Sequence, residues 1–142
     1  MFAFLCDTIP LSGKATHKNR YQQKIANSFS TYYPAVIMLN QELYSAVYYF
    51  HKRKPLSVLD ADNLSKPVVD ALEDVLYKDD KMVKIRRSGI FDLNQNEIDI
   101  LDLTKMPKNV FSDFLKLLDT SDHIIYVEFG NLSYNMFEFG IE

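Results

Sequence analysis

Aspartate side chains crowd into the region between residues 60 and 80 of this chain. Five of them are candidates for chemistry and are interleaved with apolar residues instead of forming a polar tract: Asp60, Asp62, Asp70, Asp79 and Asp80. Carboxylates held close together are costly unless a cation neutralises them. Hard oxygen ligands of this kind suit Mg²⁺, or alternatively Mn²⁺, which also bind water and phosphate oxygens. The region therefore predicts a magnesium-dependent enzyme that acts on phosphate esters.

A helix is predicted over about residues 63–76. At 100° per residue, Asp62, Lys66 and Asp70 lie close together on one side, so that the lysine falls between two carboxylates. An apolar stripe covers the other side, at Leu64, Val68, Leu72 and Val75. The ordinary alternative is a helix cap at Asp62 or Asn63 and an exposed Lys66–Asp70 ion pair worth a few tenths of a kcal/mol. The downstream pair of aspartates favours the metal site.

The spacing Asp-x-Asp-Asn-Leu-x-Lys-x-x-x-Asp-Ala-Leu, followed by Asp-Asp, resembles the signature of the RusA-type Holliday junction resolvases. The resemblance covers roughly residues 1–105 and includes an apolar run at 43–50 that leads into a basic turn. It implies that Asp60, Asp62 and Asp80 bind the metal and that Lys66 is catalytic. Supporting roles are expected for three further residues of the motif: Asn63, Asp70 and Asp79.

The resemblance implies a magnesium-dependent, structure-specific endodeoxyribonuclease that cleaves four-way DNA (Holliday) junctions by hydrolysing phosphodiester bonds. It also implies a homodimer, because symmetric cutting of two strands needs two active sites related by a two-fold axis. Two alternatives stay open: a metal-dependent nuclease on other branched or single-stranded DNA, and a catalytically weak module that binds DNA or protein. Pro67 favours the second, since proline disfavours the helical conformation of the preceding Lys66.

The net charge of −3 argues against a generic nucleic-acid binder. The negative charge is concentrated in residues 106–142, with 2 basic and 6 acidic side chains, whereas residues 1–105 have 14 basic and 13 acidic. DNA contacts are therefore predicted for basic residues around the motif, although an ordinary solvated surface explains them equally well: Lys14, Lys18, Arg20, Lys52, Arg53, Lys54, Arg86 and Arg87. The single cysteine excludes an internal disulfide framework and a cysteine-rich zinc site.

Hydrophobic periodicity predicts strands over 2–7, 43–51, 82–91 and 97–103, and helices over 19–32 and 63–76. The order β-α-β-α-β-β indicates an α+β, two-layer domain with helices on one face of a mixed sheet. This nuclease core is expected to span residues 1–105. No run approaches the roughly 20 apolar residues that cross a bilayer, so the expected location is the cytoplasm.

Residues 106–142 fall outside the resemblance. A helix is predicted after Pro107, with strands over 123–129 and 134–139. These residues are too few to form a second domain alone. We therefore expect a C-terminal extension that packs on the same domain or on a dimer partner, or that engages another protein. A chain ending near Lys105 is expected to lose solubility or dimerisation but to keep its metal ligands.

Overall fold

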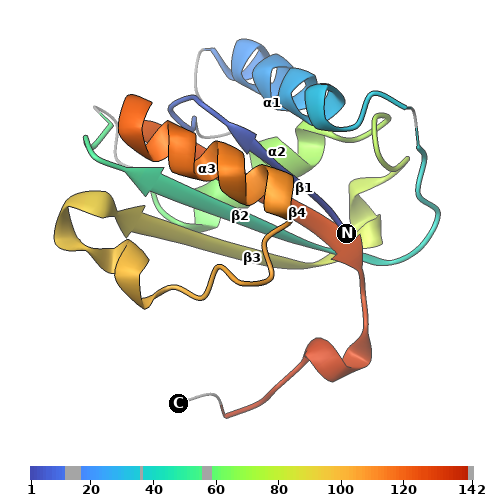
Figure 1. Ribbon diagram of the computed structural model, residues 1–142. Helices are drawn as coiled ribbons and strands as arrows, with labels where there is room; N and C mark the ends of the chain where they lie inside the picture. Colours follow the sequence, from blue (N-terminus) through green and yellow to red (C-terminus); the bar gives the residue numbers. More distant parts are fainter. Residues whose placement is uncertain (12–16, 36, 56–58, 141–142) are drawn as a thin grey trace.

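The computed structural model describes residues 1–11, 17–35, 37–55 and 59–140. Within these ranges the chain forms strands and helices in the order β1 (Phe2–Cys6), α1 (Lys18–Tyr32), β2 (Leu43–His51), α2 (Asp62–Ala71), β3 (Val83–Asp92), α3 (Lys108–Thr120) and β4 (His123–Asn131) (Figure 1). Short 3₁₀ turns lie at Asp80–Met82, Leu93–Gln95, Glu97–Ile100 and Tyr134–Met136. Among the described helices, none has the length and apolarity needed to span a membrane.

The four strands form one mixed sheet in the order β1-β4-β2-β3. β4 pairs antiparallel with both β1 and β2, whereas β2 and β3 are parallel. The expected α+β class with a mixed sheet is confirmed. The segment after residue 105 packs on the same domain, because it contributes an inner strand of the sheet.

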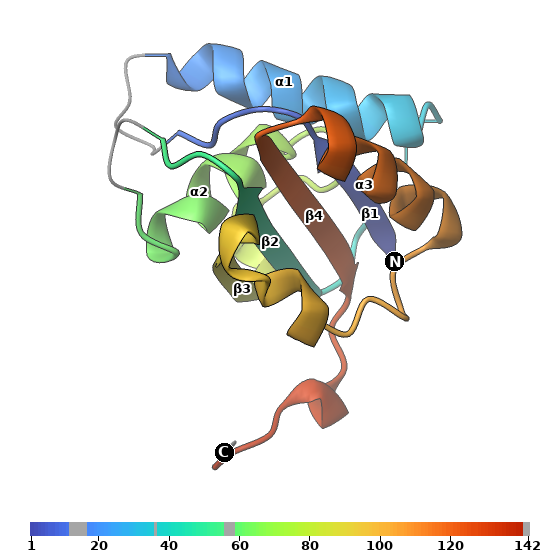
Figure 2. The same cartoon turned by 60° about the vertical axis from the view of Figure 1, so that its left-hand side comes forward.

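Apolar side chains of the strands alternate between the two faces of the sheet. On β4, Ile125 and Val127 belong to a core with α1 and α2, whereas Ile124 and Tyr126 pack with α3. Figures 1 and 2 show α3 in front of the sheet and α1 with α2 behind it. α1 and α2 thus cover one face of the sheet and α3 covers the other, so the domain has three layers where two were expected.

Two of the predicted strands are absent from the described residues. The segment over 97–103 begins with a 3₁₀ turn at Glu97–Ile100, after Asn96 in the left-handed conformation (φ 57°). The Glu97 carboxylate accepts a hydrogen bond from the backbone N–H of Asp92 (2.6 Å), which closes the polar turn after β3. β3 pairs with β2 and is the edge strand of the described sheet, and residues 97–103 do not pair with its open side, so the expected 82–91/97–103 hairpin does not form.

The segment over 134–139 forms a 3₁₀ turn at Tyr134–Met136 instead of a strand. It follows β4, whose two edges are already occupied by β1 and β2. Figures 1 and 2 show this C-terminal segment leaving the body of the domain. The strand predicted from its aromatic residues therefore has no open position beside β4.

The second helix is shorter than expected. α2 ends at Ala71, and Asp74 takes a positive φ of 64° a few residues later. The backbone N–H of Asp74 donates to the carbonyl of Tyr77 (2.7 Å), so the chain turns here instead of continuing the helix to residue 76. This turn carries Glu73 toward the start of β3.

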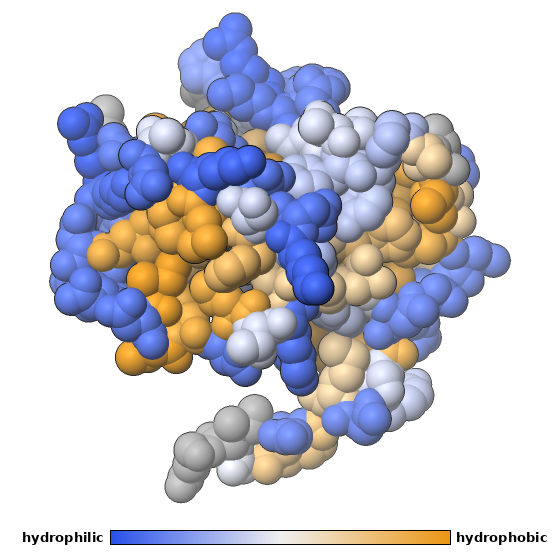
Figure 3. Space-filling view, in the orientation of Figure 1, coloured by the Kyte–Doolittle hydropathy of each residue, from blue (hydrophilic) through white to orange (hydrophobic). Residues whose placement is uncertain are grey.

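Hydrophobic side chains gather on the face of the molecule shown in Figure 3. A groove of about 460 Å³ lies between the segment after the 3₁₀ turns and the start of α3, lined by Leu101, Leu103, Thr104, Met106, Lys108 and Phe111. Ile100 is 84% exposed and Leu115 on α3 is 48% exposed. An apolar patch of this kind is typical of a surface that contacts another molecule.

Candidate active site

Helix α2 arranges the motif as the spacing predicts. Its apolar and small residues are buried against the sheet, at Leu64, Ser65, Pro67, Val68 and Val69. Asp62 and Lys66 are exposed and Asp70 is half-buried, each four residues from the last, so the three share the solvent side of the helix. One amphipathic helix therefore presents two carboxylates and an ammonium on the same face.

Pro67 lies inside α2 without ending it. Its side chain is buried, and its carbonyl accepts a hydrogen bond from Gln22 Nε2 of α1 (3.0 Å). The preceding Lys66 keeps helical geometry and its Nζ reaches Asp70 Oδ1 at 3.0 Å. The proline therefore does not misplace the lysine, and it no longer favours a module without catalysis.

Lys66 joins α2 to the start of β3. Its ammonium donates to Asp70 Oδ1 (3.0 Å) and to Asp80 Oδ2 (3.3 Å), and Asp80 opens the 3₁₀ turn directly before β3. The hydrogen bonds to Asp70 and Asp80 raise the pKa of Lys66 above its ordinary value. The bond from Lys66 is the main cause that holds the pKa of Asp80 below its ordinary value. Both groups therefore stay charged at neutral pH.

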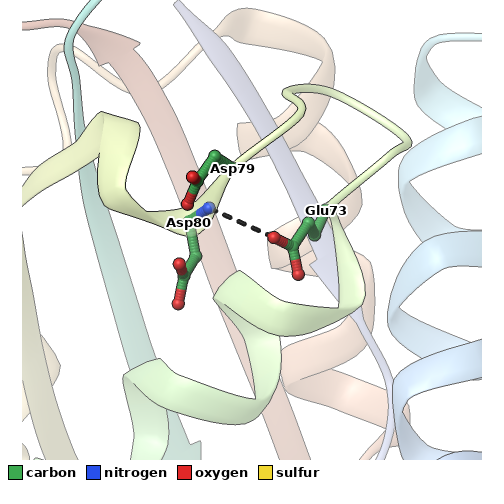
Figure 4. Close-up of side chains that lie close together, drawn as sticks. All are labelled: Glu73, Asp79 and Asp80. Carbon is green, nitrogen blue, oxygen red and sulfur yellow. Dashed lines mark hydrogen bonds between the residues drawn. The ribbon is translucent and has the colours of Figure 1, made fainter.

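Asp80 is held by its backbone as well as by its side chain. Its N–H donates to Glu73 Oε1 (3.4 Å), as Figure 4 shows, and its carbonyl accepts from the Arg86 guanidinium (3.3 Å). The same guanidinium lies 3.8 Å from Asp80 Oδ2. Asp79 caps the 3₁₀ turn by accepting from the N–H of Lys81 (2.9 Å). These contacts fix the orientation of Asp80 at the entrance to β3.

Three carboxylates at this place could hold a metal ion. Glu73, Asp79 and Asp80 each offer an oxygen, and the three oxygens lie within 4.8 Å of one another (Figure 4). An all-carboxylate donor set suits a hard divalent cation such as Mg²⁺ or Mn²⁺. Of the predicted ligands, the structure brings Asp80 into this group. Asp60 and Asp62 are exposed at the start of α2 and do not belong to it, so their ligand role stays a prediction.

Glu73 is the site residue that sequence reasoning missed. A helix continuing to residue 76 would have made Glu73 one more acidic residue on its surface. The carboxylate approaches Asp80 only because α2 ends at Ala71 and the chain turns. The sequence signal was the density of acidic residues between the motif and the downstream aspartate pair, which does not by itself identify a partner.

The predicted DNA-contacting residues that the structure describes belong to three segments, the start of α1, the turn after β2, and β3. Lys14 lies outside the described residues. Arg20 lines a shallow groove of about 200 Å³ at the start of α1 together with His17 and Lys24, and the half-buried Lys18 begins the same helix. Basic groups around such a groove suit a phosphate backbone.

The basic turn after β2 is partly engaged within the domain. The Lys52 ammonium donates to the carbonyl of Leu118 near the end of α3, and Arg53 Nε lies 3.4 Å from Asp122 Oδ2. Lys54 is exposed. Lys52 therefore links this turn to α3, whereas Arg53 pairs with the residue directly before β4.

Arg86 and Arg87 are neighbours on β3, so their side chains leave opposite faces of the sheet. Arg86 contacts Asp80, whereas the Arg87 guanidinium donates to the carbonyl of Met136 in the C-terminal segment (3.4 Å). Arg86 alone of this pair lies at the candidate active site.

Comparison with known protein families agrees with the motif. The model of the family described as "Endodeoxyribonuclease RusA" matches residues 12–100, well over half of the chain. The matched range contains all of α2, the Asp79–Asp80 pair and β3. A search of the curated proteins gave no match. The chain therefore belongs to the RusA endodeoxyribonuclease family of Holliday junction resolvases.

Proposed function

We propose that this protein is a magnesium-dependent, structure-specific endonuclease that hydrolyses phosphodiester bonds in four-way DNA junctions and acts as a homodimer. The observation that supports this most is the position of the Lys66 ammonium between Asp70 and Asp80, beside the carboxylates of Glu73 and Asp79. The group lies within the range that matches the family.

The residues of the site have separate roles in this proposal. The carboxylate of Asp80 holds the divalent ion together with further acidic residues. A divalent ion held there would supply a more acidic water molecule and positive charge for the phosphoryl oxygens. Lys66, whose raised pKa keeps it protonated, donates to a phosphate oxygen or stabilises the leaving oxygen. Asp70 orients Lys66 from one turn along α2.

Two ligand sets share Asp80. The family resemblance supports Asp60 and Asp62 as its partners, and the distances between carboxylate oxygens support Glu73 and Asp79. Both sets consist of carboxylates, so both suit magnesium. The two sets are distinguished by single substitutions that keep side-chain shape, such as Asp62→Asn and Glu73→Gln.

The homodimer follows from the two symmetric cuts that resolve a junction. The apolar face in Figure 3 offers a surface that a subunit contact would cover. Ile100 and Leu115 are among the exposed large apolar side chains of the domain. We place the protein in the cytoplasm, where it acts on branched DNA, and we keep a further protein partner at the C-terminal segment as part of the proposal.

Incubation with a synthetic four-way junction tests the activity. We expect paired nicks at symmetric positions when Mg²⁺ is present and intact strands when a chelator replaces it. A linear duplex with the sequence of one arm serves as the control substrate and should stay intact. Cleavage of flaps or single strands at the same rate as the four-way junction would instead support a metal-dependent nuclease that acts on other branched or single-stranded DNA.

The salt dependence of DNA binding tests the groove at the start of α1. Replacing Arg20 and Lys24 together by alanine should reduce the slope of log affinity against log salt by about 2, since each lost phosphate contact removes about one unit. Binding to a junction would be measured without divalent metal, so that no strand is cut. Alanine at Lys52 and Arg53 is the comparison, because both side chains already have partners within the domain. A salt slope that is reduced only by alanine at Lys52 and Arg53 would show that the turn after β2 contacts the DNA instead.

A further inference from the structure

The oxygen of Asp80 that faces α2 already has a cation beside it. Lys66 Nζ lies 3.3 Å from Asp80 Oδ2 and the Arg86 guanidinium lies 3.8 Å from the same oxygen. A carboxylate that binds metal would therefore exchange one positive partner for another. The exchange raises the question of which group moves when the metal binds.

We propose that Lys66 is an exchangeable counter-ion of Asp80, which metal binding displaces toward Asp70 and the DNA phosphate. The inference rests on the proposed metal site at Asp80. The Lys66 ammonium lies 3.3 Å from an oxygen of the Asp80 carboxylate. A divalent ion bound to the same carboxylate would repel this ammonium, even at the high dielectric of a surface. In the structure the ammonium is engaged with Asp80, and metal binding would release it from that contact.

Lys66 is the group free to move. Its side chain is 59% exposed, and its flexible stem already reaches a second acceptor, Asp70 Oδ1, at 3.0 Å. Asp70 is four residues further along α2, so the ammonium keeps a partner after it leaves Asp80. Few contacts have to be broken for this movement, because the exposed pair is weak.

Arg86 and Asp80 are less free. The guanidinium donates to the backbone carbonyl of Asp80, and the backbone N–H of Asp80 donates to Glu73. The Arg86 side chain is 30% exposed, half the value for Lys66. Arg86 therefore stays in place and positions the turn before β3. Lys66 is the group that leaves Asp80 when the metal binds.

Mn²⁺ binding to the full-length protein, measured by calorimetry without DNA, tests the inference. Lys66→Gln should bind Mn²⁺ about three- to tenfold more tightly than the wild type, because the ion no longer displaces an ammonium. The matched control is Lys78→Gln. It removes the same charge from a nearby pair, Lys78–Asp74 at 3.4 Å, and should change the affinity less than twofold.

Junction cleavage gives a second readout that a purely structural role would not reproduce. Lys66→Gln should cleave more slowly while it binds Mn²⁺ more tightly. Two results together would overturn the exchange but leave the proposed function standing. Lys66→Gln and Lys78→Gln would bind Mn²⁺ with equal affinity, and Asp80→Asn would not bind it. Wild-type protein that binds no Mn²⁺ would overturn both.

Discussion

Asp80→Asn is expected to lower the rate of junction cleavage by roughly 10²- to 10³-fold, the range found when one preorganised electrostatic group is removed. Asparagine keeps the shape of the side chain but removes the charge that would hold the metal and that pairs with Lys66. The side chain of Asp80 is 27% exposed, so the fold should survive. Single-turnover cleavage in Mg²⁺, with a thermal melt of each variant, measures both effects.

Asp74→Asn is the matched control for this substitution. Asp74 belongs to the same acidic region, but it is 73% exposed and pairs with Lys78. Its replacement should leave the cleavage rate within about twofold, as expected for a surface pair. An Asp80→Asn protein that cleaves at the wild-type rate would contradict every ligand set considered for this site.

Parallel measurements on Asp62→Asn and Glu73→Gln identify the partners of Asp80. Loss of cleavage in Asp62→Asn alone would support the ligands implied by the family resemblance. Loss in Glu73→Gln alone would support the group of carboxylate oxygens within 4.8 Å. Loss in both would place all of these side chains in one site.

A chain that ends at Lys105 is expected to be unfolded, contrary to the expectation from its sequence. It would lack β4, which lies between β1 and β2 and carries three fully buried side chains on one face: Ile125, Val127 and Phe129. Each buried apolar side chain of this size contributes about 1.5–3 kcal/mol, whereas a whole domain is stable by only about 5–15 kcal/mol. Far-ultraviolet circular dichroism and amide NMR dispersion measure the loss.

A chain that ends at Leu132 is the control for the shorter one. It keeps β4 and α3 and removes the 3₁₀ turn at Tyr134–Met136, so it should fold. Well-dispersed amide signals from the chain ending at Lys105 would show that residues 1–105 fold without β4. In that case the C-terminal segment would be an addition to the domain.

The sequence by itself determined the helices and the local arrangement of the motif. The periodic apolar residues of α1 and α2 predict helices that the structure contains, because one stripe of a helix must be buried. The four-residue spacing of Lys66 and Asp70 predicts their contact, and the two groups lie 3.0 Å apart. These features depend on neighbours along the chain, so a short stretch of sequence carries them.

Only the tertiary structure decided which distant segments meet. Apolar residues predicted strands over 97–103 and 134–139, but such a pattern does not specify a pairing partner, and both segments contain a 3₁₀ turn instead. The approach of Asp80 to Lys66 and Glu73 depends on the turn after α2 and on the parallel pairing of β3 with β2. Contacts between distant segments result from how the whole chain buries its apolar surface, and no local pattern contains that information.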